Sequence, residues 1–313
     1  MSRNIGRQAI RCVCSTLLMV SMTGSHGIAQ EERVVGLSAP KHPAVTIPNT
    51  ELRTVHSQIV NQQFSISIQL PPNYFTDSTT IYPVIYVTDA NRSFPMVANI
   101  SSVLAFPKAN LPEIIVVGIG YAIKDMADWA AWRSRDLTPT NDTGTDNHWN
   151  ALLAKMTGRK FAVTSGGAPR FLEFIIKELI PFVESNYRVS RLDRGLAGYS
   201  YGGLFVLYAL FTHPETFGRY FAGSPSLEYD HDVIFDYEKK FAATGKGLRA
   251  KVFLSAGSLE DSSTITDVKK MADRLQSRYR PGFEVSSHVF EGEDHRSCMA
   301  AAVMRAFRVL YGQ

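Results

Sequence analysis

The sequence contains few cysteines and no pattern for binding a metal ion. It has three cysteines in 313 residues, and Cys12 and Cys14 lie in a segment that we expect to be removed. Only Cys298 would then remain, so the mature chain cannot form an intramolecular disulfide. The eight histidines are scattered, without pairs at helical or zinc-motif spacing. The sequence therefore predicts neither a disulfide scaffold nor a zinc hydrolase, and we expect no cofactor.

The sequence also lacks a strong charge of either sign. The formal net charge is +4, and loss of the N-terminal Arg3, Arg7 and Arg11 leaves +1. A nearly neutral chain gives no electrostatic basis for binding nucleic acid or an anionic membrane surface. We therefore expect no nucleic-acid partner, while the oligomeric state cannot be inferred.

The apolar stretch near the N-terminus is too short to span a bilayer. The stretch Cys12–Met22 follows the basic residues and precedes small residues that end in Gly27-Ile28-Ala29. This order is typical of a secretory signal peptide, so we expect segment 1–29 to be removed and Gln30 to become the N-terminus. The alternatives are a buried N-terminal helix or a lipid anchor. The protein is thus predicted to be exported, periplasmic or secreted, without stable membrane insertion.

Two β-rich runs follow a proline-containing lead-in at 30–48. The runs are Val55–Val60 and Phe64–Leu70, and the second alternates apolar and polar residues. Such a pair predicts an antiparallel hairpin at the edge of a sheet.

The rest of the chain alternates between strand and helix patterns. Short apolar runs, typical of parallel strands buried on both faces, occur at Tyr82–Val87, Ile114–Ile119, Gly195–Ala197, Tyr220–Ala222, Lys251–Ser255 and Phe283–Phe290. Helical patterns occur at Phe171–Tyr187, Tyr201–Thr212, Val233–Ala243, Thr264–Tyr279 and Ser297–Tyr311. This alternation predicts an α/β fold in residues 30–313, a single domain with a mainly parallel sheet covered by helices on both faces.

Residues 121–169 interrupt that alternation. They show little regular pattern, but they contain aromatic patches, several glycines and clustered polar residues. A connection this long within a compact domain is usually functional or disordered. Its position above the carboxyl edge of the sheet, where ligands bind in open α/β sheets, predicts that it forms a wall or lid of the substrate site.

The strongest local motif is Gly198-Tyr199-Ser200-Tyr201-Gly202. The G-x-S-x-G pattern alone is weak, but here it follows a predicted strand and begins an apolar helix. That context is required by the nucleophile elbow of α/β hydrolases, where a strained turn exposes the serine. The alternative is a structural glycine-rich turn. We predict that Ser200 is the nucleophile.

A serine nucleophile needs a general base, which follows it in the order Ser, acid, His. His213 ends a helix, His288 alternates in a strand and should face a packed side, and His231 starts a helix that could line the pocket. His295 lies in a polar loop between the last strand and the last helix. That loop reaches the carboxyl edge of the sheet, so His295 is the predicted base.

Two neighbouring carboxylates compete for the role of the acid. Glu260 and Asp261 follow the predicted strand Lys251–Ser255, and only one of two adjacent loop residues can meet the imidazole. Glu260 is favoured and Asp261 stays open.

The predicted oxyanion hole consists of two backbone N–H groups. One is that of Tyr201, directly after the nucleophile. The other is that of Asn91, or of Ala90 beside it, in the turn after the strand Tyr82–Val87.

At this point the chain resembles the putative esterase family of α/β hydrolases, which includes trilactone siderophore esterases, feruloyl and acetyl xylan esterases, esterase D-like enzymes and mycolyltransferases. The resemblance rests on stretches in the family's order: Pro83–Asp89, Arg133–Pro139, Gly166–Ala168 leading into 171–183, Gly198–Gly203, Ser224–Ser226 and Gly257–Glu260. It implies a triad of Ser200, Glu260 and His295, with the acid three residues after a glycine. Relatives often have Asp-Gly where this chain has Asp89-Ala90, which leaves the geometry of the oxyanion turn open.

The block Arg133–Pro139 is most similar to the siderophore-esterase branch. Arg133 and Arg135 could bind a substrate carbonyl or phenolate, or form salt bridges with Asp136 or Asp128.

Aromatic residues near these positions have similar alternatives. Trp129, Trp132 and Trp149 could stack on an aromatic group of the substrate or pack within the lid. We also expect Tyr199, beside the nucleophile, to contact the substrate.

The sequence therefore predicts a serine-dependent carboxylic ester hydrolase that forms an acyl-enzyme with a small-molecule ester, possible substrates including siderophore-type esters. Two alternatives stay open: an acyltransferase with the same triad, and a non-catalytic module that binds a siderophore or sugar ester.

Overall fold

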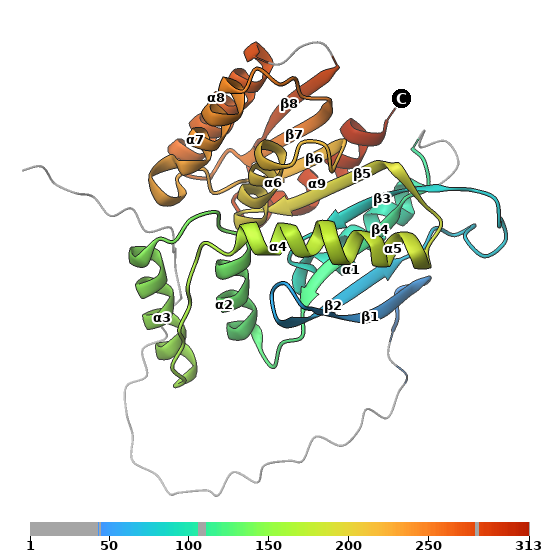
Figure 1. The fold of residues 1–313 in the computed structure, drawn as a ribbon, viewed down its shortest axis with the longest axis horizontal. Coiled ribbons are helices and arrows are strands. Elements are labelled where there is room, and N and C mark those ends of the chain that lie inside the picture. Colours follow the sequence, from blue (N-terminus) through green and yellow to red (C-terminus); the bar gives the residue numbers. More distant parts are fainter. Residues whose placement is uncertain (1–42, 44, 106–110, 279–281, 313) are drawn as a thin grey trace, which may run out of the picture. The chain divides into compact units, whose positions relative to one another are not determined.

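The computed structural model describes residues 43, 45–105, 111–278 and 282–312 (Figure 1). The predicted signal peptide 1–29 lies outside these residues. The chain divides into two compact units, Met1–Val45 and Thr46–Gln313, and every helix and strand of the described residues belongs to the second.

An eight-stranded sheet forms the centre of the second unit, in the order β1-β2-β4-β3-β5-β6-β7-β8. The strands are β1 (Thr50–Ser57), β2 (Gln62–Gln69), β3 (Tyr82–Val87), β4 (Ile115–Tyr121), β5 (Val189–Tyr199), β6 (Arg219–Gly223), β7 (Ala250–Gly257) and β8 (Phe283–Phe290). β1 and β2 pair antiparallel and β2 is antiparallel to β4, whereas all other neighbours are parallel. The predicted mainly parallel sheet is confirmed.

The predicted hairpin at the sheet edge is also confirmed, with a shifted turn. β1 ends at Ser57, and the turn falls at 58–61 rather than between Val60 and Phe64. Ser57 Oγ accepts a hydrogen bond from the Val60 backbone N–H at 3.0 Å, and Asn61 adopts a positive φ of 56°. Asparagine tolerates this left-handed conformation better than most residues, so the chain reverses there.

Helices cover both faces of the sheet, as predicted. On one face, α1 (Ala90–Leu104) and α9 (Cys298–Tyr311) pack over an apolar layer. The other face is covered by α4 (Ala168–Phe174), the π-helical turn η1 (Ile175–Leu179), α5 (Ile180–Asn186), α6 (Tyr201–Thr212), α7 (Tyr229–Ala243) and α8 (Ser262–Arg278). Within the described ranges, no helix combines the length and the apolar character needed to cross a membrane.

Residues 121–169 are more regular than the sequence pattern indicates. They contain two helices, α2 (Met126–Asp136) and α3 (Thr143–Thr157), which lie beyond the end of α4 (Figure 1). Each helix begins at an aspartate that caps it: Asp125 accepts from two backbone N–H groups of α2, and Asp142 from two of α3. Their apolar faces are too incomplete to give a helical period, so these N-caps were the usable signal.

α1 is also missing from the sequence expectation, because Pro95 lies within it. Pro95 is the sixth residue of this helix, so the helix forms without the hydrogen bond that the Asn91 carbonyl would otherwise accept. This helix fixes the turn after β3 that the site uses.

Candidate active site

Ser200 lies at a sharp turn between β5 and α6. Its backbone has φ 61° and ψ −120°, a conformation that costs free energy for any residue with a Cβ. Glycines make the turn possible, because a Cβ on Gly198 would collide with the Gly202 backbone and one on Gly202 would collide with Thr88 Oγ1. The turn therefore presents the Ser200 hydroxyl at the N-terminus of α6, where the helix dipole favours negative charge.

The structure brings Glu260 and His295 together. Glu260 follows β7, His295 lies between β8 and α9, and His295 Nδ1 is 2.7 Å from Glu260 Oε2. The two loops are joined by the backbone, since Leu259 N–H donates to the Glu293 carbonyl at 3.0 Å. A Cβ on Gly257 would collide with the Glu293 backbone, so glycine permits this close approach.

Asp261, the competing carboxylate, is exposed to solvent. The side chain of Glu260 is only 4% exposed, against 41% for that of His295. Of the two neighbouring acids, Glu260 is therefore the one that meets the imidazole.

A polar chain behind the imidazole holds Glu260 in place. The Gly257 N–H donates to Glu260 Oε1 at 2.7 Å, and the Ser224 hydroxyl lies 2.7 Å from both Glu260 Oε1 and the Tyr199 hydroxyl. An ionised carboxylate can only accept, so Ser224 donates to Glu260 and Tyr199 donates to Ser224. Tyr199 therefore supports the acid through Ser224, and its ring lies 5.3 Å from that of His295.

These contacts set the ionisation of the acid. Burial by itself would raise the pKa of Glu260, but hydrogen bonds from His295, the Gly257 N–H and Ser224 outweigh it and hold this pKa below its ordinary value. Glu260 therefore stays negatively charged, which is what orients a neutral imidazole and stabilises a protonated one.

The two predicted oxyanion donors lie at helix N-termini. Tyr201 is the first residue of α6 and Asn91 is the second residue of α1. Backbone N–H groups in a first helical turn have no partner within the helix, so both can face a developing negative charge. The side chain of Asn91 is engaged elsewhere, donating to the Tyr121 carbonyl at 2.9 Å and accepting from the Tyr121 N–H at 2.7 Å.

The turn after β3 accommodates Ala90, where relatives often have glycine. The left-handed residue is Asp89, with φ 57°, whereas Ala90 is already helical. Alanine is therefore not forced into a positive φ.

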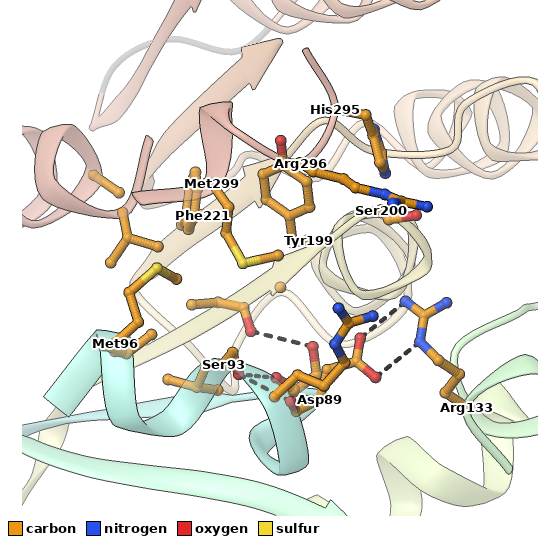
Figure 2. A pocket seen from close by; sticks show the side chains of 18 of the residues that line it. Asp89, Ser93, Met96, Arg133, Tyr199, Ser200, Phe221, His295, Arg296 and Met299 are labelled. Atoms are coloured by element: carbon orange, nitrogen blue, oxygen red, sulfur yellow. Dashed lines mark hydrogen bonds and ion pairs between the residues drawn. The ribbon is translucent and has the colours of Figure 1, made fainter. Parts of the chain in front are cut away.

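A cavity of about 380 Å³ opens at Ser200 and His295 (Figure 2). Its outer part is lined by polar and charged side chains, including Asp89, Arg92, Arg133 and Arg296. Its inner part runs between α1 and α9 over the sheet and is lined by apolar side chains such as Met96, Phe221, Met299 and Phe307. The volume lies within the range of small-molecule pockets.

Of the two predicted substrate-binding arginines, Arg133 lines this cavity and Arg135 does not. Arg133 forms a bidentate ion pair with Asp89, both distances being 2.9 Å, so its partner is neither of the acids that the sequence suggested. Its guanidinium also lies over the rings of Trp129, at 4.9 Å, and Tyr201, at 5.1 Å.

Arg135 instead forms the salt bridge that was the structural alternative. Its guanidinium contacts Asp136 at 2.7 and 2.8 Å and Gln62 at 2.5 Å. It lies two residues from Arg133 on α2, so it projects from a different side of the helix.

Some of the predicted aromatic residues line the cavity and one does not. Trp129 and Trp149 line the cavity together with Tyr199, whereas Trp132 packs against Tyr121 with ring centroids 5.9 Å apart. The predicted pocket role of Trp132 therefore does not agree with the structure. Trp129 and Arg133 are four residues apart on α2, so both lie on the face of that helix that meets the cavity. This shared face follows from the sequence only if the segment is known to be helical.

The other three histidines that follow Ser200 in the sequence lie outside the cavity. His213 caps the C-terminal end of α6, as expected. His288 is exposed on β8, so the prediction that it faces a packed side is wrong. His231 is exposed at the start of α7, in a left-handed conformation with φ 57°.

Several residues of the site are absent from the sequence predictions. These are Asp89, Arg92, Met96, Ser224, Arg296 and Met299. Three of them had a signal in the sequence: Asp89 ends the Pro83–Asp89 stretch, Ser224 begins the Ser224-Pro225-Ser226 stretch, and Arg296 follows the predicted base.

The contacts of Glu260 predict a pH-dependent contribution to stability. Its pKa is below the ordinary value of 4.5, so the stabilisation is complete above that value and is lost as the pH falls through the folded-state pKa. Glu260→Gln cannot ionise and should be less stable than the wild type at neutral pH, by about 1–3 kcal/mol. Urea unfolding should show this difference narrowing in acid. Glu291→Gln, at an exposed position, is the control, and a gap that stays constant with pH would contradict the prediction.

Known proteins resemble the chain over most of its length. The family model described as "Putative esterase" matches residues 57–159 and 157–308. The ferri-bacillibactin esterase BesA of Bacillus subtilis is 32% identical over 273 residues, covering 85% of this chain and 90% of that protein. A siderophore triacetylfusarinine C esterase of Aspergillus fumigatus is 29% identical over 255 residues, covering 73% of this chain and 81% of that protein.

A solved structure agrees with these matches. The crystal structure of the BES protein from Bacillus cereus has a TM-score of 0.75 and 27% identity, and it covers 88% of this chain and 100% of that one. With the family model spanning most of the sheet and its helices, the chain has the α/β-hydrolase fold, belongs to the putative esterase family and is an esterase.

Proposed function

We propose that the protein is a serine hydrolase that cleaves siderophore-type and other small carboxylic esters through an acyl-enzyme. The observation that carries the proposal is the hydrogen bond of 2.7 Å between His295 Nδ1 and Glu260 Oε2, at the mouth of the cavity that Ser200 lines. This bond leaves Nε2 of the imidazole to accept a proton. In Figure 2 the imidazole points toward the side of the cavity where Ser200 lies.

In the first half of the reaction, Ser200 Oγ bonds to the acyl carbon while His295 removes the hydroxyl proton. The N–H groups of Tyr201 and Asn91 stabilise the negative charge on the carbonyl oxygen. The C–O bond to the alcohol then breaks, and the alcohol leaves with the proton from His295. In the second half, water adds its oxygen to the acyl carbon, and the proton returns through His295 to Ser200 as the acid departs.

The substrate class is supported by the relatives and by the charge at the cavity mouth. Two relatives are named as esterases of ferri-bacillibactin and triacetylfusarinine C. Arg92 and Arg296 line the mouth, and both are exposed. The Arg92 guanidinium lies 5.2 Å from the centre of the Trp129 ring. Exposed guanidinium groups at this place can bind an anionic or carbonyl-rich ligand. Arg133 is already neutralised by Asp89 and serves mainly to position the wall of the cavity.

Ser200→Ala should abolish hydrolysis of a ferric siderophore ester and of p-nitrophenyl acetate, with kcat falling by roughly 10⁴-fold or more because no nucleophile remains. Ser185→Ala, an exposed serine on α5, is the matched control and should keep normal turnover. Near-normal activity of Ser200→Ala would contradict the mechanism. Added acceptor alcohols, with product analysis, would reveal acyl transfer in place of hydrolysis.

Glu260→Gln should lower kcat by roughly 10²- to 10⁴-fold, because the amide cannot stabilise the protonated imidazole. Asp261→Asn should stay near the wild type, since this carboxylate is exposed and lies outside the contact with His295. Steady-state kinetics of both variants on one ester decide between the acids. Equal losses, or the reverse order, would remove Glu260 from the triad.

We propose that the protein is exported after removal of residues 1–29. The support is the order of basic, apolar and small residues at the N-terminus. Expression of the full chain in a bacterial host should give a product in the periplasm or medium whose mass corresponds to a start at Gln30. A full-length product confined to the cytoplasm would contradict this proposal.

A further inference from the structure

The cavity continues beyond Ser200 into an apolar channel that the proposed catalytic steps do not use. One wall is formed by α1 and the other by α9, and side chains of the sheet form the floor. The residues that define the channel are Met96, Phe221, Met299, Val303, Ala306 and Leu310. All of them are apolar, in contrast with the arginines at the mouth.

The channel is deep. On α9 its lining extends from Met299 to Leu310, which corresponds to roughly 16 Å along a helix axis. On β3 its lining includes Ile85 and Val87, which are roughly 7 Å apart along a strand. The side chains at its inner end, such as Leu310 and Phe307, are almost fully buried, so a chain that enters at Ser200 reaches them by displacing the side chains around it.

The side chains in the channel favour one kind of ligand. A polar group placed there would lose its water without gaining hydrogen-bond partners, whereas an apolar chain is stabilised by each methylene that leaves water. Figure 2 shows Met96 and Met299 extending into the cavity from opposite walls. Methionine side chains are unbranched and adaptable, so they can move aside for a chain and pack along it.

An ester bound at Ser200 has an alcohol portion and an acyl portion. These two portions can differ in polarity, as the two parts of the cavity do. The arginine-lined mouth suits a polar alcohol portion, and the channel suits an apolar acyl portion. We propose that this channel is an acyl-chain site and that the enzyme also hydrolyses esters whose acyl group is an unbranched apolar chain of medium length. The inference rests on the proposed nucleophile Ser200, but it adds a substrate class to the siderophore esters.

The first test is the chain-length profile of the full protein on p-nitrophenyl acetate, butyrate, hexanoate, octanoate and decanoate. Burial of the chain should raise kcat/KM by about two- to four-fold per methylene, so octanoate, with four more methylenes, should exceed butyrate by roughly 16- to 250-fold. The increase should come with a falling KM. A maximum at acetate or butyrate would overturn the inference.

The second test fills the channel. Ala306→Phe places a ring in the inner part, and Ala300→Phe, at an exposed position of the same helix, is its matched control. The ratio of kcat/KM for octanoate over butyrate should fall at least about ten-fold in Ala306→Phe and stay at the wild-type value in Ala300→Phe. Met96→Trp, at a half-buried position of the opposite wall, should lower the ratio as well, and it decides the matter if Ala306→Phe does not fold.

The outcomes separate this inference from the proposed function. If the wild type has a high ratio of kcat/KM for octanoate over butyrate and neither Ala306→Phe nor Met96→Trp lowers it, the channel is not the acyl site. Ser200-dependent cleavage of a siderophore ester without a preference for longer acyl chains would overturn the inference and leave the proposed function intact. If the wild type hydrolyses no ester in a Ser200-dependent way, both the inference and the proposed function are overturned.

Discussion

The site depends on one buried carboxylate. Glu260 is almost fully excluded from water, so its charge is stable only with hydrogen-bond donors around it. Those donors come from three places in the fold: the Gly257 backbone at the end of β7, Ser224 after β6 and His295 before α9. The carboxyl ends of neighbouring parallel strands are what bring them together, so the orientation of His295 depends on the packing of the whole sheet.

A second ion pair shapes the opposite wall. Asp89 ends the turn after β3, and its pairing with Arg133 fixes α2 against the start of α1. Both side chains are about one-tenth exposed, and removal of one partner would leave the other charged and nearly buried. The arginine that the sequence suggested as a substrate ligand therefore pairs with Asp89 and holds the first turn of α1 in place.

The cavity joins these two walls into a site with two environments. Arg92 and Arg296 give its mouth positive charge, and α1 with α9 give its interior an apolar lining. The positively charged mouth fits the siderophore-type esters that we propose as substrates, and the apolar interior fits the acyl chain that we propose. Both portions of the cavity lie beside Ser200, the nucleophile that we propose.

The sequence by itself determined the parallel sheet, its edge hairpin, the elbow at Ser200 and the candidate residues Glu260 and His295. These follow from local rules, because strand periodicity, glycine spacing and chain order are properties of short segments. The tertiary structure alone decided that Arg133 pairs with Asp89, that Trp132 packs away from the cavity, and that α1 and α9 enclose a channel. The sequence did not predict the pairing of Arg133 or the packing of Trp132, because the helices in residues 121–169 are marked by N-caps rather than by an apolar period. The channel depends on side chains that are far apart in sequence, such as Met96 and Met299, and no local pattern places them face to face.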